Sequence, residues 1–111
     1  MSTEEIKLYR YETYDISIRG NLTPSEFIVI KETPKGYWFV PDYVFNFYMD
    51  QEWVVSTSRR WTSKVAKRRY AYPSEKEALG SFIARKNRQI LLLEEQLMRA
   101  KDSLHLAMEV E

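Results

Sequence analysis

The C-terminal segment constrains the fold more than any other part of the chain. From Ser74 to about Ala107 there is no proline, and the only glycine is Gly80. Ser74-Glu-Lys-Glu77 has the spacing of a capping box, in which the Ser74 hydroxyl accepts from the N–H of residue 77 and the Glu77 carboxylate from that of Ser74. At about 1.5 Å per residue, a helix over residues 74–108 is a rod of roughly 50 Å. A compact domain of this length is only about 35 Å across. The sequence therefore predicts a helix longer than the body on which it lies.

Apolar residues at three- and four-residue spacing form a seam along this helix, which is interrupted only by Lys86. The seam consists of Leu79, Ile83, Ile90, Leu93, Leu97, Ala100, Leu104 and Ala107. Such a seam is typical of a helix that packs on its own sheet, and also of a coiled coil. Leu91, Leu92, Met98 and Leu106 lie roughly opposite it, so residues 90–93 are apolar nearly all round.

Since one sheet covers only one of these faces, the other face needs a second cover. We therefore expect a homodimer, with a different partner or a helix that curls back as the alternatives. The residues predicted to form the dimer are Ile83, Ile90, Leu91, Leu93, Leu97, Met98 and Leu104.

The segment before residue 74 has the composition of strands and turns. It holds fifteen of the sixteen aromatic residues and all four prolines. Alternation predicts a first strand over residues 6–19, and the apolar run 27–30 predicts a central strand that forms a hairpin with residues 37–40. Gly36 is expected to take a positive φ at the end of the turn. One or two further strands are expected between residues 43 and 72. The fold class is α+β in a single domain: an antiparallel sheet of about four to five strands in residues 1–73, then a long helix over residues 74–108.

The residue types needed for common catalytic and metal sites are scarce. There is no cysteine and only one histidine, His105, so thiolate zinc sites and cysteine nucleophiles are excluded. Gly36 and Gly80 belong to no phosphate-binding motif. The spacing of the carboxylates favours turns and a solvated rim over an acid–base pair. We therefore expect no enzyme activity, no metal and no cofactor. With neither a signal peptide nor an apolar run of membrane-spanning length, we expect a soluble, cytoplasmic protein with no membrane partner.

The charge is strongly segregated along the chain. Residues 59–88 contain ten basic and two acidic residues, a net charge of +8, whereas the remaining residues carry −7. The residues predicted to contact a partner or nucleic acid are Arg59, Arg60, Trp61, Lys64, Lys67, Arg68, Arg69, Tyr70, Lys76, Arg85 and Arg88.

Pro73 delivers the chain from the basic segment directly into the helix. We therefore expect Lys76, Arg85 and Arg88 to join residues 67–69 in one positive surface, with Arg85 and Arg88 exposed. Lysine and arginine neutralise phosphates, and Trp61, Tyr70 and Tyr72 offer rings for base stacking. The same pattern suits an acidic protein surface or a solvated edge hairpin, so three interpretations remain open.

The C-terminal half also resembles a class of small phage proteins. The pattern consists of Arg69-Tyr-Ala-Tyr-Pro-Ser-Glu-Lys-Glu-Ala-Leu79, the segment 81–90, and then Leu93 and Leu97. It is similar to small bacteriophage and prophage proteins in which a β-rich front is joined to a basic and then apolar helix. The front of those proteins often opens on a stretch like Tyr9-Arg-Tyr-Glu12. The resemblance covers mainly residues 69–107. It implies a non-enzymatic host-takeover or anti-defence factor of the anti-CRISPR type, which inhibits a host protein by occupying its surface. The alternative is a nucleic-acid-binding accessory protein that uses residues 59–88.

Overall fold

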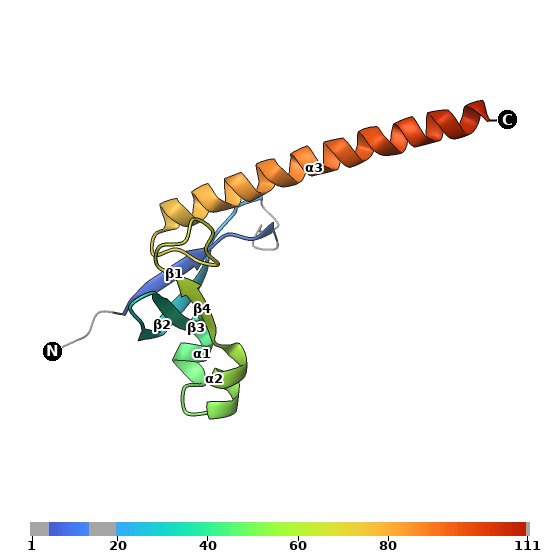
Figure 1. Cartoon of the computed structure of the whole chain (residues 1–111). Coiled ribbons are helices and arrows are strands. Elements are labelled where there is room, and N and C mark those ends of the chain that lie inside the picture. The colour runs from blue at the N-terminus through green and yellow to red at the C-terminus, as the bar shows by residue number, and fades with distance from the viewer. Residues whose placement is uncertain (1–4, 14–19, 111) are drawn as a thin grey trace.

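The computed structural model of the chain describes residues 5–13 and 20–110. Strands β1 (Lys7–Arg10), β2 (Ser25–Glu32) and β3 (Gly36–Pro41) come first, followed by helices α1 (Asp42–Phe47) and α2 (Glu52–Ser58). Strand β4 (Arg60–Ser63) and helix α3 (Glu75–Glu109) complete the chain. The strands form one antiparallel sheet in the order β1-β2-β3-β4, which confirms the predicted α+β layout. In Figure 1, α3 leaves the body and extends far beyond it.

The predicted hairpin is β2 with β3, which pair from Phe27 opposite Pro41 to Glu32 opposite Tyr37, with a shift of register between Val29 and Lys31. Thr33 closes its turn, since its N–H donates to the carbonyl of Gly36 at 2.8 Å and its Oγ1 accepts from the Gly36 N–H at 3.0 Å. The expectation that Gly36 has a positive φ is wrong. Among the described residues Gly20 alone has one, and Gly36 is instead required because β4 approaches its backbone closely.

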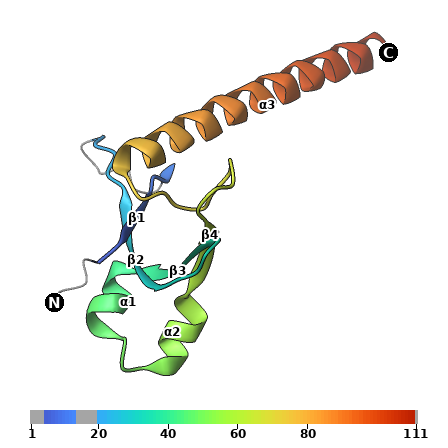
Figure 2. The same ribbon diagram turned by 60° about the vertical axis from the view of Figure 1, so that its left-hand side comes forward.

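Alternation along the strands gives the sheet two buried faces. On one face Leu8, Phe27 and Phe39 form the core with Ala71, and the ring of Tyr70 packs against them. On the other face Ile28 and Val40 are neighbours in the register, and both are buried together with Val44 of α1. Figure 2 shows α1 and α2 on the side of the sheet away from α3.

The segment 64–73 crosses from β4 back to β1 over the first of these faces. Tyr72 forms an antiparallel bridge with Tyr9, with N–H to carbonyl distances of 2.7 and 3.0 Å. The N–H of Tyr70 donates to the buried hydroxyl of Thr62 at 3.2 Å, and Arg10 donates to the carbonyl of Tyr70 at 2.7 Å. The two edge strands of the sheet are thereby joined by the most basic part of the chain.

Two parts of the strand prediction are wrong. Strand β1 ends at Arg10, opposite Ser25, because Pro24 precedes β2 and offers no N–H to extend the pairing. Residues 14–19 of the predicted strand lie outside the described residues. The further strand expected between residues 43 and 72 is present as β4, but the stretch 42–58 within that range forms α1 and α2 instead of strands. Pro41 has a φ of −56° ahead of α1, the Asp42 carboxylate accepts from the N–H of Tyr43, and Val44 is fully buried against the sheet.

Helix α3 begins as its sequence predicts. Ser74 is the N-cap, and its Oγ accepts from the N–H of Glu77 at 3.2 Å. The Glu77 carboxylate accepts from the Ser74 hydroxyl at 3.1 Å, where the capping box predicted the backbone N–H. The first turns pack on the body through the buried Ala78 and through Phe82, whose ring lies 6.3 Å from that of Tyr11. The molecule is consequently elongated, with extents of 76 × 30 × 28 Å.

Candidate functional site: a basic cleft beside the long helix

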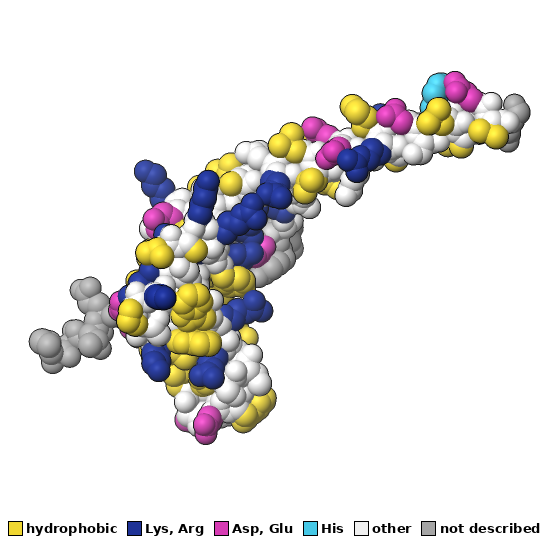
Figure 3. Space-filling view, viewed as in Figure 1, with side chains coloured by type: hydrophobic (Ala, Val, Ile, Leu, Met, Phe, Trp, Pro, Cys, Tyr) yellow, Lys and Arg dark blue, Asp and Glu magenta, His cyan; other side chains and the backbone are white. Residues whose placement is uncertain are grey.

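A cleft of about 550 Å³ lies between the segment 64–73 and the first turns of α3. Its walls are Lys67, Arg68, Arg69 and Tyr72 on one side and Ser81, Ala84, Arg85 and Arg88 on the other. Two segments of the chain thus bring five cationic side chains to one hollow. Figure 3 shows Lys and Arg side chains gathered where α3 leaves the body, whereas apolar, acidic and basic side chains are mixed along the rest of the helix. We call this hollow the basic cleft.

Short-range hydrogen bonds fix the backbone of the first wall. The Ser63 hydroxyl accepts from the N–H groups of Val65 and Ala66 at 3.1 and 2.9 Å. Nε of Arg69 donates to the carbonyl of Ala66 at 2.8 Å, and its guanidinium lies over the ring of Tyr72 at 5.5 Å. Lys67 and Arg68 are exposed, so the loop presents two free cations from an anchored backbone.

Arg85 joins the second wall to the sheet. Its guanidinium donates to the carbonyl of Tyr11 at 2.6 Å and to the Glu12 carboxylate at 3.4 Å. The expectation that this side chain is exposed is wrong, because these two acceptors draw it against the body and leave it about one-third exposed, at 35%. Arg88, one turn further along α3, is exposed as expected. Arg85 therefore positions the helix, and Arg88 is the free cation of this wall.

The remaining predicted contact residues lie away from the cleft. Arg59 lies over the ring of Trp38 at 5.0 Å, and Trp61 pairs with Trp38 across β3 and β4. Lys64 forms an ion pair with Glu32. Lys76 is exposed at the start of α3 but does not line the cleft. The predicted basic surface is thus divided, and residues 67–69 with Arg85 and Arg88 are the part brought together.

Tyr70 belongs to the core, and its ring is not free for a partner. It stacks on Phe39 with centroids 5.7 Å apart, and the guanidinium groups of Arg10 and Arg60 lie 4.3 and 4.9 Å from its ring. Arg69 lies over one face of the Tyr72 ring, so each of these two tyrosines has at least one face occupied by its own chain. The predicted stacking of bases on these rings loses its support.

Two lining residues were missing from the predicted site. Ser81 and Ala84 are small, and they share one face of α3 with Arg85 and Arg88 at three- and four-residue spacing. Their spacing relative to the arginines was a usable signal. What was not visible in the sequence is that the loop 64–73 lies across from this face.

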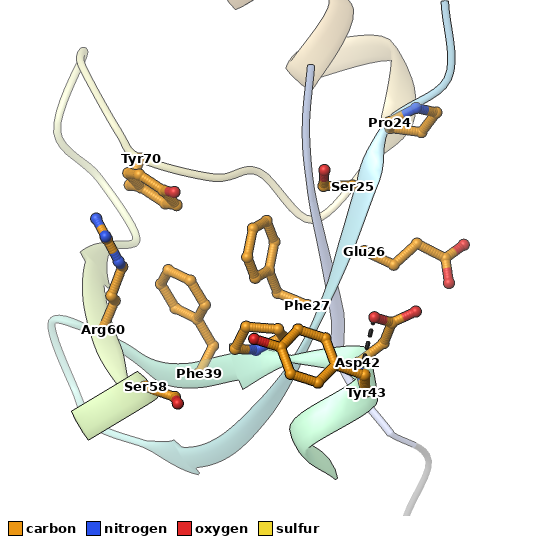
Figure 4. A pocket seen from close by; sticks show the side chains of 11 residues that line it. Pro24, Ser25, Glu26, Phe27, Phe39, Asp42, Tyr43, Ser58, Arg60 and Tyr70 are labelled. Atoms are coloured by element: carbon orange, nitrogen blue, oxygen red, sulfur yellow. Dashed lines mark hydrogen bonds between the residues drawn. The ribbon is translucent and has the colours of Figure 1, made fainter. Parts of the chain in front are cut away.

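A second hollow, of about 520 Å³, opens over the edge of the core. Figure 4 shows the rings of Phe27, Phe39 and Tyr70 inside it, with Arg60 beside Tyr70 and with Glu26 and Asp42 near the opposite rim. Phe27 and Phe39 are almost completely buried, so this hollow is floored by the core. Its lining combines one cation with two acids and lacks the uniform charge of the basic cleft.

The residues predicted to form a dimer are all exposed on α3. Ile83 and Ile90 are each 51% exposed, Leu97 is 55% and Met98 is 66% exposed, and Leu91, Leu93 and Leu104 are similar. Every residue from Asn87 to Val110 is exposed, so the sheet covers neither apolar face of this part of the helix. The interpretation that the seam packs on the sheet of its own chain is wrong beyond the first three turns.

Comparison of the chain with protein-family models, with curated proteins and with solved structures finds no match in any of the three. Among residues 5–13 and 20–110, no three His, Asp or Glu side chains are grouped so that they could hold a metal ion. In the same residues, no helix has the length and apolarity needed to cross a membrane.

Proposed function

We propose that this protein is a non-catalytic binding protein that occupies an acidic surface of another protein through the basic cleft. The observation that carries this proposal is the convergence of Lys67, Arg68, Arg69, Arg85 and Arg88 on one hollow. Arginine presents forked donors that match carboxylates in geometry as well as in charge. A concave surface lined in this way favours a projecting acidic group on a partner.

The charge of the rest of the molecule favours a compact acidic patch over a long nucleic acid. Residues outside 59–88 carry −7, and the outer part of α3 presents Glu94, Glu95, Asp102 and Glu109 against only Arg99 and Lys101. A duplex extending past the cleft would meet these carboxylates, whereas phosphate-driven binding needs a continuous row of cations. The occupied faces of Tyr70 and Tyr72 also remove a platform for unpaired bases.

Self-association through α3 is the second part of the proposal. Each Leu or Met side chain left in water forgoes about 1.5–3 kcal/mol of burial, and α3 exposes several of them in sequence. A second copy of the helix is the simplest cover for such a seam. A homodimer would also carry two basic clefts, which raises the avidity for a partner with repeated acidic sites.

The resemblance of residues 69–107 to small phage proteins suggests the kind of partner. We infer that the protein acts in the cytoplasm of a host cell and inhibits or modulates a host factor, such as a defence nuclease complex.

The test compares two triple variants that remove equal charge. Lys67→Ala/Arg68→Ala/Arg88→Ala removes the three exposed cations of the cleft. Lys7→Ala/Lys31→Ala/Lys35→Ala, the sheet variant, removes three exposed lysines of the sheet and of its β2–β3 turn. Immobilised wild type and the sheet variant are expected to retain the same protein from a nuclease-treated bacterial lysate, and the cleft variant is expected to lose it. The retained protein is then purified, and its affinity for the three chains is measured directly.

A second measurement separates protein from nucleic acid. Fluorescence anisotropy with a labelled DNA duplex is recorded at about 50 and 200 mM salt, over which a protein that neutralises many phosphates loses binding steeply. Tight duplex binding with a steep salt slope that the cleft variant loses would assign the cleft to nucleic acid and overturn the proposal. Equal partner affinity of the two triple variants would remove the cleft from function altogether.

A further inference from the structure

We propose that α3 pairs with α3 of a second copy in antiparallel orientation, so that residues 87–110 of the two helices lie along one another. This inference rests on the dimer in the proposed function, and it adds the orientation and the register. The length of free helix sets the first constraint. Arg85 is bonded to Tyr11 and Glu12, while every residue from Asn87 to Val110 is exposed. A helix that runs antiparallel along this segment ends where the body of the other copy begins.

Side-chain volume favours the antiparallel orientation. In a parallel coiled coil each seam residue faces its own equivalent, so Ala100 would face Ala100 and Ala107 would face Ala107. In the antiparallel pair Leu97 faces Ala100, Ile90 faces Ala107, and Leu93 faces Leu104 of the second copy. Each alanine then lies opposite a large side chain. Because close packing requires this alternation of large and small residues, the antiparallel pair leaves fewer voids.

Charge at the edges of the seam favours the same orientation. In an antiparallel pair, the seam edge that contains Glu94 and Lys101 lies against the same edge of the second copy. This places Glu94 of each copy near Lys101 of the other. In a parallel pair this edge would face Gln89, Gln96 and Ser103, which carry no charge.

Neither Glu94 nor Lys101 has an ion-pair partner within the described part of its own chain. By contrast, Glu95 is bonded to Arg99 at 2.8 Å on the outer side of the helix. Arg88 and Asp102 also form no ion pair within the described residues, but their heptad positions place them on the outer side with Glu95. Glu94 and Lys101 are thus the unpaired charges at the edge of the seam, where a second copy would reach them.

Only one register pairs every seam residue of the free segment 87–110 with an apolar residue. Moving the second helix by one heptad in one direction places the charged Lys86 opposite Leu104. Moving it by one heptad in the other direction leaves Ile90 and Leu93 without apolar partners. The register with Leu97 opposite Ala100 therefore pairs the apolar seam residues from Ile90 to Ala107 and keeps Lys86 outside the contact. Leu79 and Ile83 lie on the part of α3 next to the body and take no part in this pairing.

Cysteine cross-linking tests the arrangement without interference, because the chain contains no cysteine. Ile90→Cys and Ala107→Cys are made separately, one with a tag that changes its size, and are oxidised alone and after being unfolded and refolded together. A disulfide requires Cα atoms closer than about 7 Å, whereas two copies of residue 107 lie about 25 Å apart in the antiparallel pair. We expect no covalent dimer from either variant alone and a mixed disulfide dimer from the two together. Met98→Cys, which lies outside the seam, mixed with Ala107→Cys is the control that should not cross-link.

The cross-linking results distinguish an antiparallel pair, a parallel pair and a monomer. Self-linked Ala107→Cys would show a parallel pair and overturn the inference, as would a noncovalent dimer in which the mixture does not cross-link. A single-chain mass under all conditions would refute the dimer of the proposed function and the inference with it, while leaving the cleft to its own test.

Exchange of charge provides a second readout. Glu94→Lys is expected to weaken the dimer about tenfold, and Glu94→Lys/Lys101→Glu is expected to restore it. Glu95→Lys, on the outer face, serves as the matched control. Equal dimer affinity of the Glu94→Lys and Glu95→Lys variants would overturn the pairing of Glu94 with Lys101.

Discussion

At the scale of single residues, the close approach of β4 requires glycine at position 36. A Cβ placed on Gly36 would lie 2.3 Å from the carbonyl oxygen of Thr62 and 2.4 Å from Cζ2 of Trp61. The first of these atoms belongs to the backbone of β4, so the strand itself would have to move. Gly80, on the free side of α3, has nothing within 4 Å of such a Cβ. Substitution by alanine is therefore expected to have opposite effects on stability at these two glycines.

We expect Gly36→Ala to destabilise the protein by about 1–3 kcal/mol, because β3 and β4 must separate to admit the methyl group. Gly80→Ala should stabilise it by about 0.5–1 kcal/mol, since alanine is the better helix former. Thermal unfolding followed by circular dichroism measures both. A Gly36→Ala variant as stable as the wild type would show that the approach of β4 to β3 is looser than described.

We expect substitution of Arg85 to lower the stability of the protein, in addition to any effect on binding. Arg85→Met removes the donors to the Tyr11 carbonyl and the Glu12 carboxylate. It should cost about 1–3 kcal/mol, because the carbonyl loses its partner in a part-buried site. Arg88→Ala removes an exposed cation from the same cleft and should leave the melting temperature within about 2 °C of the wild type. Denaturant unfolding distinguishes the two variants, and equal effects would mean that Arg85 does not hold α3 to the body.

At the scale of elements, the stability of the free part of α3 is expected to depend on the proposed dimer. Residues 87–110 are all exposed and bury no side chain on the described part of the chain, whereas helices in proteins take most of their stability from tertiary packing of an amphipathic face. We expect Leu97→Glu, which puts a charge into the seam, to yield monomers with reduced helical signal and an unchanged sheet. Leu91→Glu, on the opposite face, should leave the dimer intact. Sedimentation and circular dichroism measure these effects.

The reverse result would be equally informative. If Leu91→Glu dissociates a folded protein and Leu97→Glu does not, the partner lies on the face with Leu91 and Met98, and the seam along Ile90, Leu93 and Leu97 is not the contact.

The elements with local signals could be predicted from the sequence, and those decided by packing could not. The hairpin of β2 and β3 follows from two apolar runs around a Thr-Pro-Lys-Gly turn, and α3 follows from its cap and its lack of proline. The aromatic run 43–48 has no period that separates a strand from a short helix. Its helical form is decided by the burial of Val44 on the sheet, which is a contact with residues distant in sequence.

At the scale of the whole molecule, the basic cleft is assembled by contacts that no local pattern reports. The charge of residues 59–88 was evident, yet only some of those cations meet. Thr62 and Tyr9 hold the loop through Tyr70 and Tyr72, and this places residues 67–69 beside α3. Arg60 lies on β4 and Lys64 directly follows it, so their side chains lie over the rings of Tyr70 and Tyr37 instead of entering the cleft. Segregation of charge was therefore predictable, and the selection of particular side chains was not.

The overall shape makes the orientation of the proposed dimer visible in solution. The single chain is 76 Å long, of which residues 87–110 account for about 35 Å at 1.5 Å per residue. An antiparallel pair shares this free segment and carries a body at each end, so its longest dimension should be roughly 115 Å. A parallel pair places both bodies at one end and should stay near 80 Å. Small-angle X-ray scattering of the wild type is expected to show the longer value and a second maximum in the distance distribution, from the two separated bodies. Leu97→Glu is the monomer control, with a length no greater than that of the single chain. A particle with the mass of two chains and the shorter dimension would place the bodies side by side and exclude the antiparallel arrangement.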